Sequence, residues 1–357
     1  MKARLVVMAI AALVLIAGLA IDARSTLAAW LVAWVAIGAA PLGALGVLMT
    51  SYLVRRAWTE RLHAIMVAAT SVLPVLAMLF LPVLVGMKEL YPAASEGHSL
   101  PVFKAIYLAP WFFVLRSMIS FVVLWLLALW LRAAWGDSER MIRSASVGLI
   151  VYALLLSFAG IDWVESLQPE FHSPEYGLLY LCFALLDGTA FVILMGVTSG
   201  RTIGATRGYS ALLLSVILLW TYVHAMQYIV IWAGNIPDEA VWYIARSSNG
   251  WQFVLAAVAV GQFVFPFFAL LNSRVRNSRS WLMALCALTL VMRCWEASIL
   301  ILPAVEHFAR VTVTLMLPAA LAFVAVSLWC AFERALANDG HLFRSFGRHA
   351  RAEAEAR

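Results

Sequence analysis

Apolar residues run along this chain in long stretches that short polar segments separate. An amphipathic helix of a soluble protein repeats its apolar residues every three or four positions, whereas a membrane-spanning helix needs about 20 apolar residues in succession. The stretches therefore predict an all-α polytopic membrane protein with about ten transmembrane helices. We expect these helices at residues 5–21, 27–54, 62–86, 108–131, 143–164, 175–200, 209–233, 250–272, 280–302 and 309–332.

Prolines inside two of the stretches predict local breaks. Pro74 and Pro82 lie in the third stretch, and Pro266 lies in the eighth. Proline lacks a backbone N–H and clashes with the preceding turn, so each proline frees a carbonyl oxygen that a neighbouring helix must satisfy within a membrane. We expect kinks at these three positions.

The first stretch also has features of a signal peptide, because Lys2 and Arg4 precede an apolar run. That run, from Leu5 to Ile21, is long, and no clean A-x-A cleavage motif follows it. We therefore interpret it as the first membrane span.

The composition excludes a soluble protein and a separate soluble catalytic domain. Of the 357 residues, 64% are hydrophobic and 12% are charged, whereas soluble domains have about 45–50% apolar and about 25% charged residues. About ten spans leave only short connections between them. Any activity of this chain must therefore reside in membrane helices and short loops.

Lysine and arginine residues are distributed unevenly between the two sides that alternating spans create. Eighteen lie on the side of both termini, five lie on the other side, and Arg116 and Arg293 lie within spans. Because positively charged connections stay in the cytoplasm, this count predicts that both termini are cytoplasmic. The basic residues occur in short clusters at helix ends, which does not favour nucleic acid as a partner.

Five ionisable residues fall inside the predicted spans: Arg116, Asp187, His224, Arg293 and Glu296. A charge at membrane depth costs about 2.5–3.5 kcal/mol on insertion scales, so each of these residues requires a compensating role. Arg293 and Glu296 are three positions apart on one helix and can pair directly. One interpretation is that these two residues neutralise each other, or pair with Asp187 or Arg116 across the bundle, and so fix helix packing. The other is a proton pathway, for which intramembrane carboxylates and histidines are typical.

The residues that commonly bind redox cofactors are sparse. A b-type haem is commonly held by two histidines on facing helices, but His224 is the only histidine deep inside a span. The four cysteines form no C-x-x-C or C-x-x-C-H motif, so c-type haem, iron–sulfur clusters and zinc ribbons are unsupported; they are Cys182, Cys286, Cys294 and Cys330. We expect no cofactor and no metal in this chain.

Acidic residues collect in the connections opposite the basic side. They are Asp162, Glu165, Glu170 and Glu175 after the fifth span, and Asp238 and Glu239 after the seventh. Acidic outer loops can simply mirror the positive-inside rule. Alternatively, these loops and the long connection from Met87 to Tyr107 dock a periplasmic partner.

Five blocks of sequence, in this order, resemble one known family. They read LPVLVGMKELYP…KAIYLAPWFFVLR, FAGIDWVESLQPEFHSPEYG, QYIVIWAGNIPDEAVWYIAR…GW, RVRNSRS and LVMRCWEASILILPA. Together they resemble the ActF-type membrane subunit of bacterial alternative complex III, a quinol-oxidising respiratory complex, within the wider NrfD/polysulfide-reductase membrane-subunit family. The resemblance covers roughly residues 27–305.

The resemblance implies a fold and a set of residues. The fold would have two peripheral helices (1–60), two four-helix bundles (61–200 and 201–335) and a cytoplasmic tail (336–357). Arg293 and Glu296 match the family's R-x-x-acid pattern, and Asp162 and Trp163 match its D-W pair. Asn235 and Glu239 belong to its G-N-x-P-x-E-x-x-W-Y element. We expect these last four residues to organise periplasmic loops; His224 matches no family position.

The resemblance also implies a place in a complex of the bacterial inner membrane. The chain would be a cofactor-free subunit, structural and a candidate for proton conduction, in contact with membrane lipid. An ActC-like subunit would bind quinol, and periplasmic subunits would carry haem c and iron–sulfur clusters, with a terminal oxidase as a further partner.

Two other functions stay open on the residues alone. A stand-alone proton-coupled transporter would use the same buried charges, although such transporters usually show inverted repeats with broken helices at the midplane. A membrane-embedded transferase would need a loop cluster of catalytic groups, for which His172 near Glu170 and Glu175 is the candidate.

Overall fold

The computed structural model describes residues 2–54, 57–92, 106–169, 171, 173–200, 205–305 and 308–355, with the backbone alone for 57, 58, 238 and 339–355. Every regular element in these ranges is a helix. Glu170, His172 and most of the connection between Met87 and Tyr107 lie outside the described residues.

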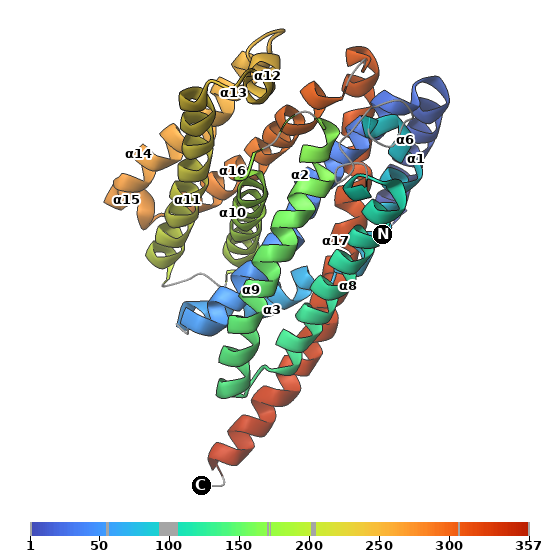
Figure 1. Ribbon diagram of the computed structural model, residues 1–357. Coiled ribbons are helices and arrows are strands. Elements are labelled where there is room, and N and C mark those ends of the chain that lie inside the picture. The colour runs from blue at the N-terminus through green and yellow to red at the C-terminus, as the bar shows by residue number, and fades with distance from the viewer. Residues whose placement is uncertain are drawn as a thin grey trace.

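Ten helical segments of the described chain are long and apolar enough to cross a membrane, which confirms the prediction from the apolar stretches. They are α1 (Lys2–Ile21), α2 (Ala23–Val54), a third segment beginning with α3 (Ala57–Thr70), α8 (Pro110–Ala133), α9 (Ser138–Trp163), α10 (Tyr176–Thr198), α11 (Thr206–Gly234), a segment from α13 (Trp251–Ala259) to α14 (Phe265–Leu271), α16 (Arg279–Ile301) and α17 (Arg310–Glu355) (Figure 1). The shorter α12 (Pro237–Arg246) lies between α11 and α13, and α15 (Ser273–Arg276) lies between α14 and α16.

Helix α2 lies at the centre of the molecule, not at its periphery as predicted. It packs against α3, α9, α10, α16 and α17. Of the residues in its most apolar stretch, 89% are buried, against 17% in that of α1. Its approach to α10 depends on glycine: a Cβ added to Gly43 would lie 1.7 Å from the carbonyl oxygen of Ala184, and one on Gly188 would lie 2.6 Å from the Cα of Gly43. Small residues allow membrane helices to pack this closely.

The last span also departs from the predicted grouping. Helix α17 packs against α1, α2 and α3 rather than with α11, α14 and α16 as in the predicted second bundle (Figure 1). An ion pair between Arg4 and Glu333 joins the beginning of α1 to the later part of α17. The helix then continues without interruption through the predicted tail to Glu355.

The prolines break the third span as predicted. It divides into α3, α4 (Leu73–Met78) and α5 (Leu81–Val85), and a proline stands in the first turn of both α4 and α5. The indole N–H of Trp34 donates to the carbonyl oxygen of Leu76 at 3.0 Å, and that of Trp30 donates to Leu79 at 3.0 Å. Neighbouring α2 thus satisfies carbonyls within the broken span.

The eighth span is also irregular at its proline. A π-helical turn, Val260–Val264, directly precedes α14, and Pro266 is the second residue of α14. Such single turns interrupt the regular helical hydrogen bonding and are a known cause of kinks. The regular helix is therefore interrupted at the position where the sequence predicts a kink.

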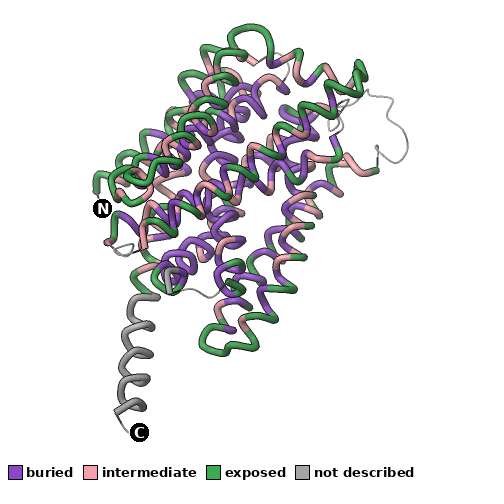
Figure 2. Tube along the Cα trace, turned by 90° about the vertical axis from the view of Figure 1, so that its left-hand side faces the viewer, coloured by how far each residue is buried: buried purple, intermediate pink, exposed green. Residues whose placement is uncertain are grey.

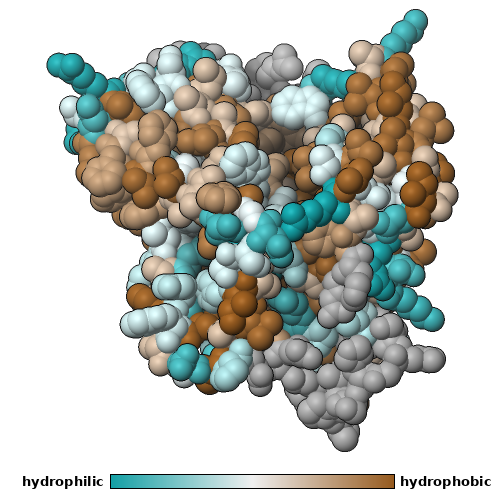
Figure 3. Space-filling model, turned by 90° about the horizontal axis from the view of Figure 1, so that it is seen from above, coloured by the Kyte–Doolittle hydropathy of each residue, from teal (hydrophilic) through white to brown (hydrophobic). Residues whose placement is uncertain are grey.

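Large apolar side chains cover the outside of the molecule. Buried residues follow the middle of the bundle and exposed ones its outer faces (Figure 2). Leu13 of α1, Trp232 of α11 and Phe268 of α14 are among the exposed hydrophobic residues. Seen from above, hydrophobic side chains gather in patches at the periphery, and hydrophilic ones lie across the middle and project at some corners (Figure 3). This distribution suits a protein surrounded by lipid.

Candidate functional site

Glu296 is the centre of a buried polar cluster formed by α11 and α16. Its carboxylate pairs with the guanidinium of Arg293, one turn earlier on the same helix. Its Oε1 atom lies 3.0 Å from the Nε2 atom of His224 and accepts a hydrogen bond of 3.0 Å from the indole N–H of Trp220. Trp220 and His224 are four positions apart, so one face of α11 presents both side chains to Glu296.

Arg293 is completely buried. Its guanidinium lies 4.7 Å from the ring centre of Trp220 and 5.1 Å from that of Phe183. These ring faces stabilise the cation beyond its pairing with Glu296. Both members of the pair point into the protein, as expected from the cost of exposing charge to lipid.

Asp187 lies near this cluster but is not bonded to it. Its side chain is on α10 and only 1% exposed, and neither carboxylate oxygen has a hydrogen-bond partner among the described residues. Arg293 attracts it electrostatically, yet in the described chain Asp187 forms no ion pair within 4.0 Å. A buried polar group without a partner is costly, so Asp187 is the least satisfied residue of the predicted set.

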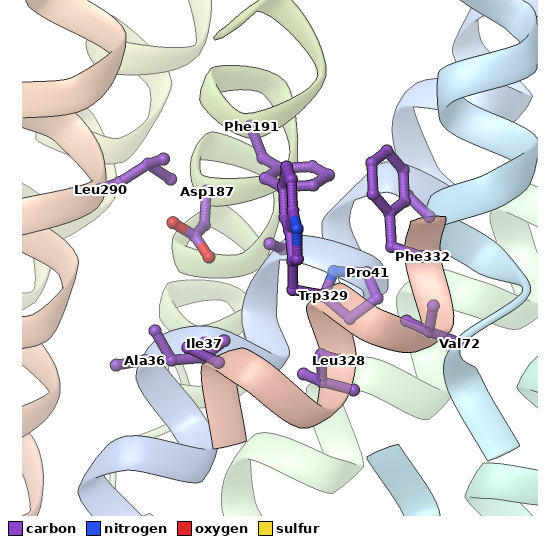
Figure 4. A pocket seen from close by; sticks show the side chains of 13 residues that line it. Ala36, Ile37, Pro41, Val72, Asp187, Phe191, Leu290, Leu328, Trp329 and Phe332 are labelled. Atoms are coloured by element: carbon purple, nitrogen blue, oxygen red, sulfur yellow. The ribbon is translucent and has the colours of Figure 1, made fainter. Parts of the chain in front are cut away.

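Two cavities lie beside these ionisable residues. One, of about 190 Å³, contains Asp187 and is formed by α2, α3, α10, α16 and α17 (Figure 4). The other, of about 200 Å³, contains His224 and Glu296 and is formed by α11, α12, α13 and α16. A proton donor or acceptor could therefore approach Asp187 from one cavity and Glu296 from the other.

Arg116 does not join this cluster, although the sequence left open that it pairs across the bundle with a member of the Arg293–Glu296 pair. Its guanidinium donates two hydrogen bonds, of 2.9 and 2.8 Å, to the carboxylate of Asp162. It also donates to the carbonyl oxygen of Tyr107 at 2.7 Å. The bidentate geometry is the strongest form of this pairing, and it ties α8 to α9.

Asp162 and Trp163 lie in the last turn of α9, within the predicted fifth span (143–164) and at its end. Trp163 is completely buried; its indole N–H donates to the Oγ atom of Ser117 at 3.1 Å. Its carbonyl oxygen accepts a hydrogen bond of 2.9 Å from the hydroxyl of Tyr91. Through these contacts the pair still holds neighbouring connections to the helix end.

Asn235 and Glu239 lie where α11 turns into α12. Asn235 adopts the left-handed conformation, with φ 48° and ψ 37°, and its N–H donates to the carbonyl oxygen of Ile231 at 3.1 Å. Asparagine tolerates this conformation better than most residues and is a common helix terminator. Glu239 lies in the first turn of α12 and forms no ion pair within the described part of the chain.

Arg246 is a buried residue that the sequence analysis did not single out. It ends α12 with no exposed surface and donates to the carbonyl oxygens of Ile299 (2.9 Å), Leu300 (3.0 Å) and Trp242 (2.8 Å). Burial lowers the pKa of its guanidinium to about 9, so the group remains charged at neutral pH. A cation on the last carbonyls of α16 is favourable because the helix dipole is negative there.

A signal for Arg246 was present in the sequence but ambiguous. Arginine is rare in the connections predicted to lie opposite the termini, and Trp242 precedes Arg246 by one helical turn, the spacing at which a guanidinium stacks on an indole ring. In the structure the two groups are 3.7 Å apart.

Among the described residues, no group of three or more His, Cys, Asp and Glu side chains is arranged to hold a metal ion. No protein-family model matches the chain, and no curated protein matches it.

Proposed function

We propose that this chain is an integral membrane subunit of a quinol:acceptor oxidoreductase and conducts protons through the cluster around Glu296. The observation that carries the proposal is the series of buried Asp187, Arg293 and Glu296 and half-buried His224, with one cavity beside Asp187 and another beside His224. Ionisable groups at membrane depth are rare and are characteristic of ion and proton pathways. The resemblance of five sequence blocks to the ActF-type subunit favours a respiratory complex as the setting.

His224 and Glu296 have the geometry for a direct proton transfer. The Nε2 atom of His224 and the Oε1 atom of Glu296 are 3.0 Å apart, within hydrogen-bond reach. His224 also lines the cavity on its side and is the more exposed of the two groups. A proton arriving from that cavity would therefore meet the imidazole first and the carboxylate second.

Arg293 and Asp187 form the other half of the pathway. The guanidinium of Arg293 pairs with Glu296 and attracts Asp187 electrostatically, so it lowers the cost of keeping either carboxylate charged. A proton that leaves Glu296 would be taken up by Asp187, which faces the second cavity. In this scheme Arg293 separates two proton-binding carboxylates without releasing a proton itself.

Electron transfer in this proposal belongs to partner subunits. An ActC-like subunit would oxidise quinol, and periplasmic subunits with haem c and iron–sulfur clusters would pass electrons to the acceptor or to a terminal oxidase. Co-purification tests this part: after mild detergent extraction, we expect such chains to accompany this one. Its isolation as a single polypeptide that moves protons with another solute would instead support the transporter alternative.

Proton conduction is tested in the intact complex. We expect Glu296→Gln to preserve subunit content and quinol oxidation without a membrane potential, and to lower proton translocation per quinol. Asp187→Asn should have the same effect. Ser215→Ala, on the exposed face of α11, is the matched control. Unchanged proton stoichiometry in both acidic variants, with intact assembly, would reduce the cluster to a packing role.

A further inference from the structure

Four arginines, here called the arginine cluster, gather where α15 packs against α11 and α16 (Figure 1). Arg207 lies in the first turn of α11, Arg274 and Arg276 lie in α15, and Arg279 begins α16. The Oγ atom of Ser210, one turn after Arg207, donates to the carbonyl oxygen of Arg276 at 3.0 Å and joins the first two of these helices. The count of positive charges predicts that this end faces the cytoplasm.

The arginine cluster has no acidic partner. The sequence contains no aspartate or glutamate from Gly188 to Pro237, nor from Ala240 to Trp295. In the described chain none of the four guanidinium groups forms an ion pair within 4.0 Å, whereas those of Arg4, Arg116 and Arg140 do. Cations held close together repel one another, so an anion from outside the chain would stabilise this arrangement.

The beginnings of two helices add to the positive potential. The N-terminus of a helix carries a partial positive charge, which favours acidic residues in the first turn. Asp137 and Glu139 lie there at the start of α9. Helices α11 and α16 have no acidic residue in their first turns and have Arg207 and Arg279 instead. Arginine at these positions opposes the helix dipole, and a bound anion would offset that cost.

Arg276 is the least satisfied member of the arginine cluster. Its side chain is half-buried, and its enclosed Nε–H has no hydrogen-bond partner among the described residues. Arg279 donates to the carbonyl oxygen of Val197 at the end of α10, which attaches its side chain to that helix. A buried donor without an acceptor is costly, and the planar guanidinium matches the geometry of a phosphate group. A phosphate would supply the missing acceptor.

The residues beside the arginine cluster indicate that this phosphate belongs to a lipid. Trp281, two positions after Arg279, is 44% exposed, and Phe268 and Leu271 of α14 are 64% and 54% exposed. Tryptophan at the end of a span is typical of the headgroup level of a bilayer. Acyl chains would cover the two exposed side chains of α14, which a soluble anion would leave uncovered.

We infer that the arginine cluster binds an anionic glycerophospholipid, whose phosphate accepts hydrogen bonds from Arg274, Arg276 and Arg279 and whose acyl chains lie along α14. Basic groups at the cytoplasmic ends of membrane helices recognise such headgroups. A zwitterionic lipid fits less well, because its ammonium group would lie beside four guanidinium groups. The inference is independent of the proposed function and holds whether or not protons pass through Glu296.

Binding can be measured by native mass spectrometry of the full purified chain in detergent. The probes are phosphatidylglycerol and phosphatidylcholine with identical acyl chains. We expect phosphatidylglycerol to bind at least about tenfold more tightly, because its headgroup carries no cation to oppose the arginine cluster. Excess inorganic phosphate should not displace it, since the free anion gains no contact with the apolar side chains.

Two double variants separate this site from the general effect of positive charge. Arg274→Gln with Arg276→Gln should weaken phosphatidylglycerol binding at least about tenfold, because charge-assisted hydrogen bonds to the phosphate are lost. Arg140→Gln with Arg143→Gln, near the start of α9, is the matched control, since it removes two charges at another helix end on the same predicted side. It should bind the lipid as the unaltered chain does. Elution volume and thermal unfolding verify that each variant is folded.

Three results would overturn the inference. They are equal affinity for the two lipids, equal weakening in the two double variants, and displacement of the lipid by inorganic phosphate. The inference is also wrong if Arg274→Gln with Arg276→Gln keeps its lipid affinity but loses a subunit from the extracted complex. That outcome would assign the arginine cluster to an acidic surface of a partner protein.

Discussion

Asp162 and Asp187 are two buried aspartates in one protein, with opposite surroundings. Their exposed fractions are 2% and 1%, and each lies on a membrane-spanning helix. The carboxylate of Asp162 accepts two hydrogen bonds from Arg116, whereas that of Asp187 has no partner among the described residues. Since native proteins satisfy nearly all buried polar groups, an exception requires a reason other than folding.

The same contrast separates two buried arginines. Arg246 donates to three backbone carbonyls and stacks on Trp242, which joins α12 to the end of α16. Arg293 has no backbone carbonyl as a partner in the described chain and depends on Glu296 and two ring faces. The comparison teaches that the charges at these helix ends are fully satisfied by neighbouring groups, whereas those in the middle of the bundle have fewer partners.

The largest effect on stability should come from breaking the satisfied pair. Asp162→Ala leaves Arg116 without its anion, and breaking a buried ion pair costs about 3–5 kcal/mol. Thermal unfolding of the purified chain in detergent should show the loss, together with lower assembly of the complex. The double variant Arg116→Met, Asp162→Leu is the control and should lose less, because no charge is stranded. Normal yield and subunit content in Asp162→Ala would contradict a structural role.

A smaller loss is expected at Arg246. Arg246→Met removes three hydrogen bonds from a charged donor, and we expect a loss of at least about 2 kcal/mol. Backbone amide exchange in residues 237–246 should accelerate, since α12 then loses its attachment to α16. Arg246→Lys keeps the charge but not the several N–H donors of the guanidinium, so it should restore part of the protection of these amides from exchange. Unaltered exchange in Arg246→Met would show that α12 is held by other contacts.

At the Arg293–Glu296 pair, the single variant should again be less stable than the double variant. Arg293→Met strands Glu296, but His224 and Trp220 still hydrogen-bond its carboxylate, so we expect a loss of about 2 kcal/mol. Arg293→Met with Glu296→Leu should be closer to the unaltered chain in thermal unfolding. If the pair only packs the helices, the double variant also keeps proton-coupled output; if Glu296 carries protons, it assembles and loses that output.

The smallest effect on stability should be at Asp187. Asp187→Leu removes a buried carboxylate that has no partner, so we expect the unfolding free energy to stay within about 0.5 kcal/mol or to rise. The same variant should lose proton translocation. Asp162→Leu is the matched control, because it removes a carboxylate of similar burial that is fully paired. Equal destabilisation by Asp187→Leu and Asp162→Leu would erase the contrast between the two aspartates.

The candidate site could be predicted in part. Arg293 and Glu296 were recognisable as a pair because they lie one helical turn apart, and the cost of charge in lipid indicated that both are buried. The partner of Arg116 could not be predicted, because Asp162 is 46 positions away and several other acidic residues could have paired with Arg116. His224 likewise meets Glu296 across 72 positions. Such pairings depend on which helix faces meet, and sequence spacing carries no information about that.

The sequence by itself determined that the chain is helical and has ten segments able to cross a membrane, and it located the proline breaks. Bilayer thickness sets the length of each span, and backbone hydrogen bonding without water requires a helix; both constraints act along a single segment. Only the tertiary structure decided that α2 is central, that α17 joins α1 and α3, and that Asp187 faces a cavity. Those outcomes depend on close contacts such as that between Gly43 and Gly188, where two distant segments must fit each other in shape.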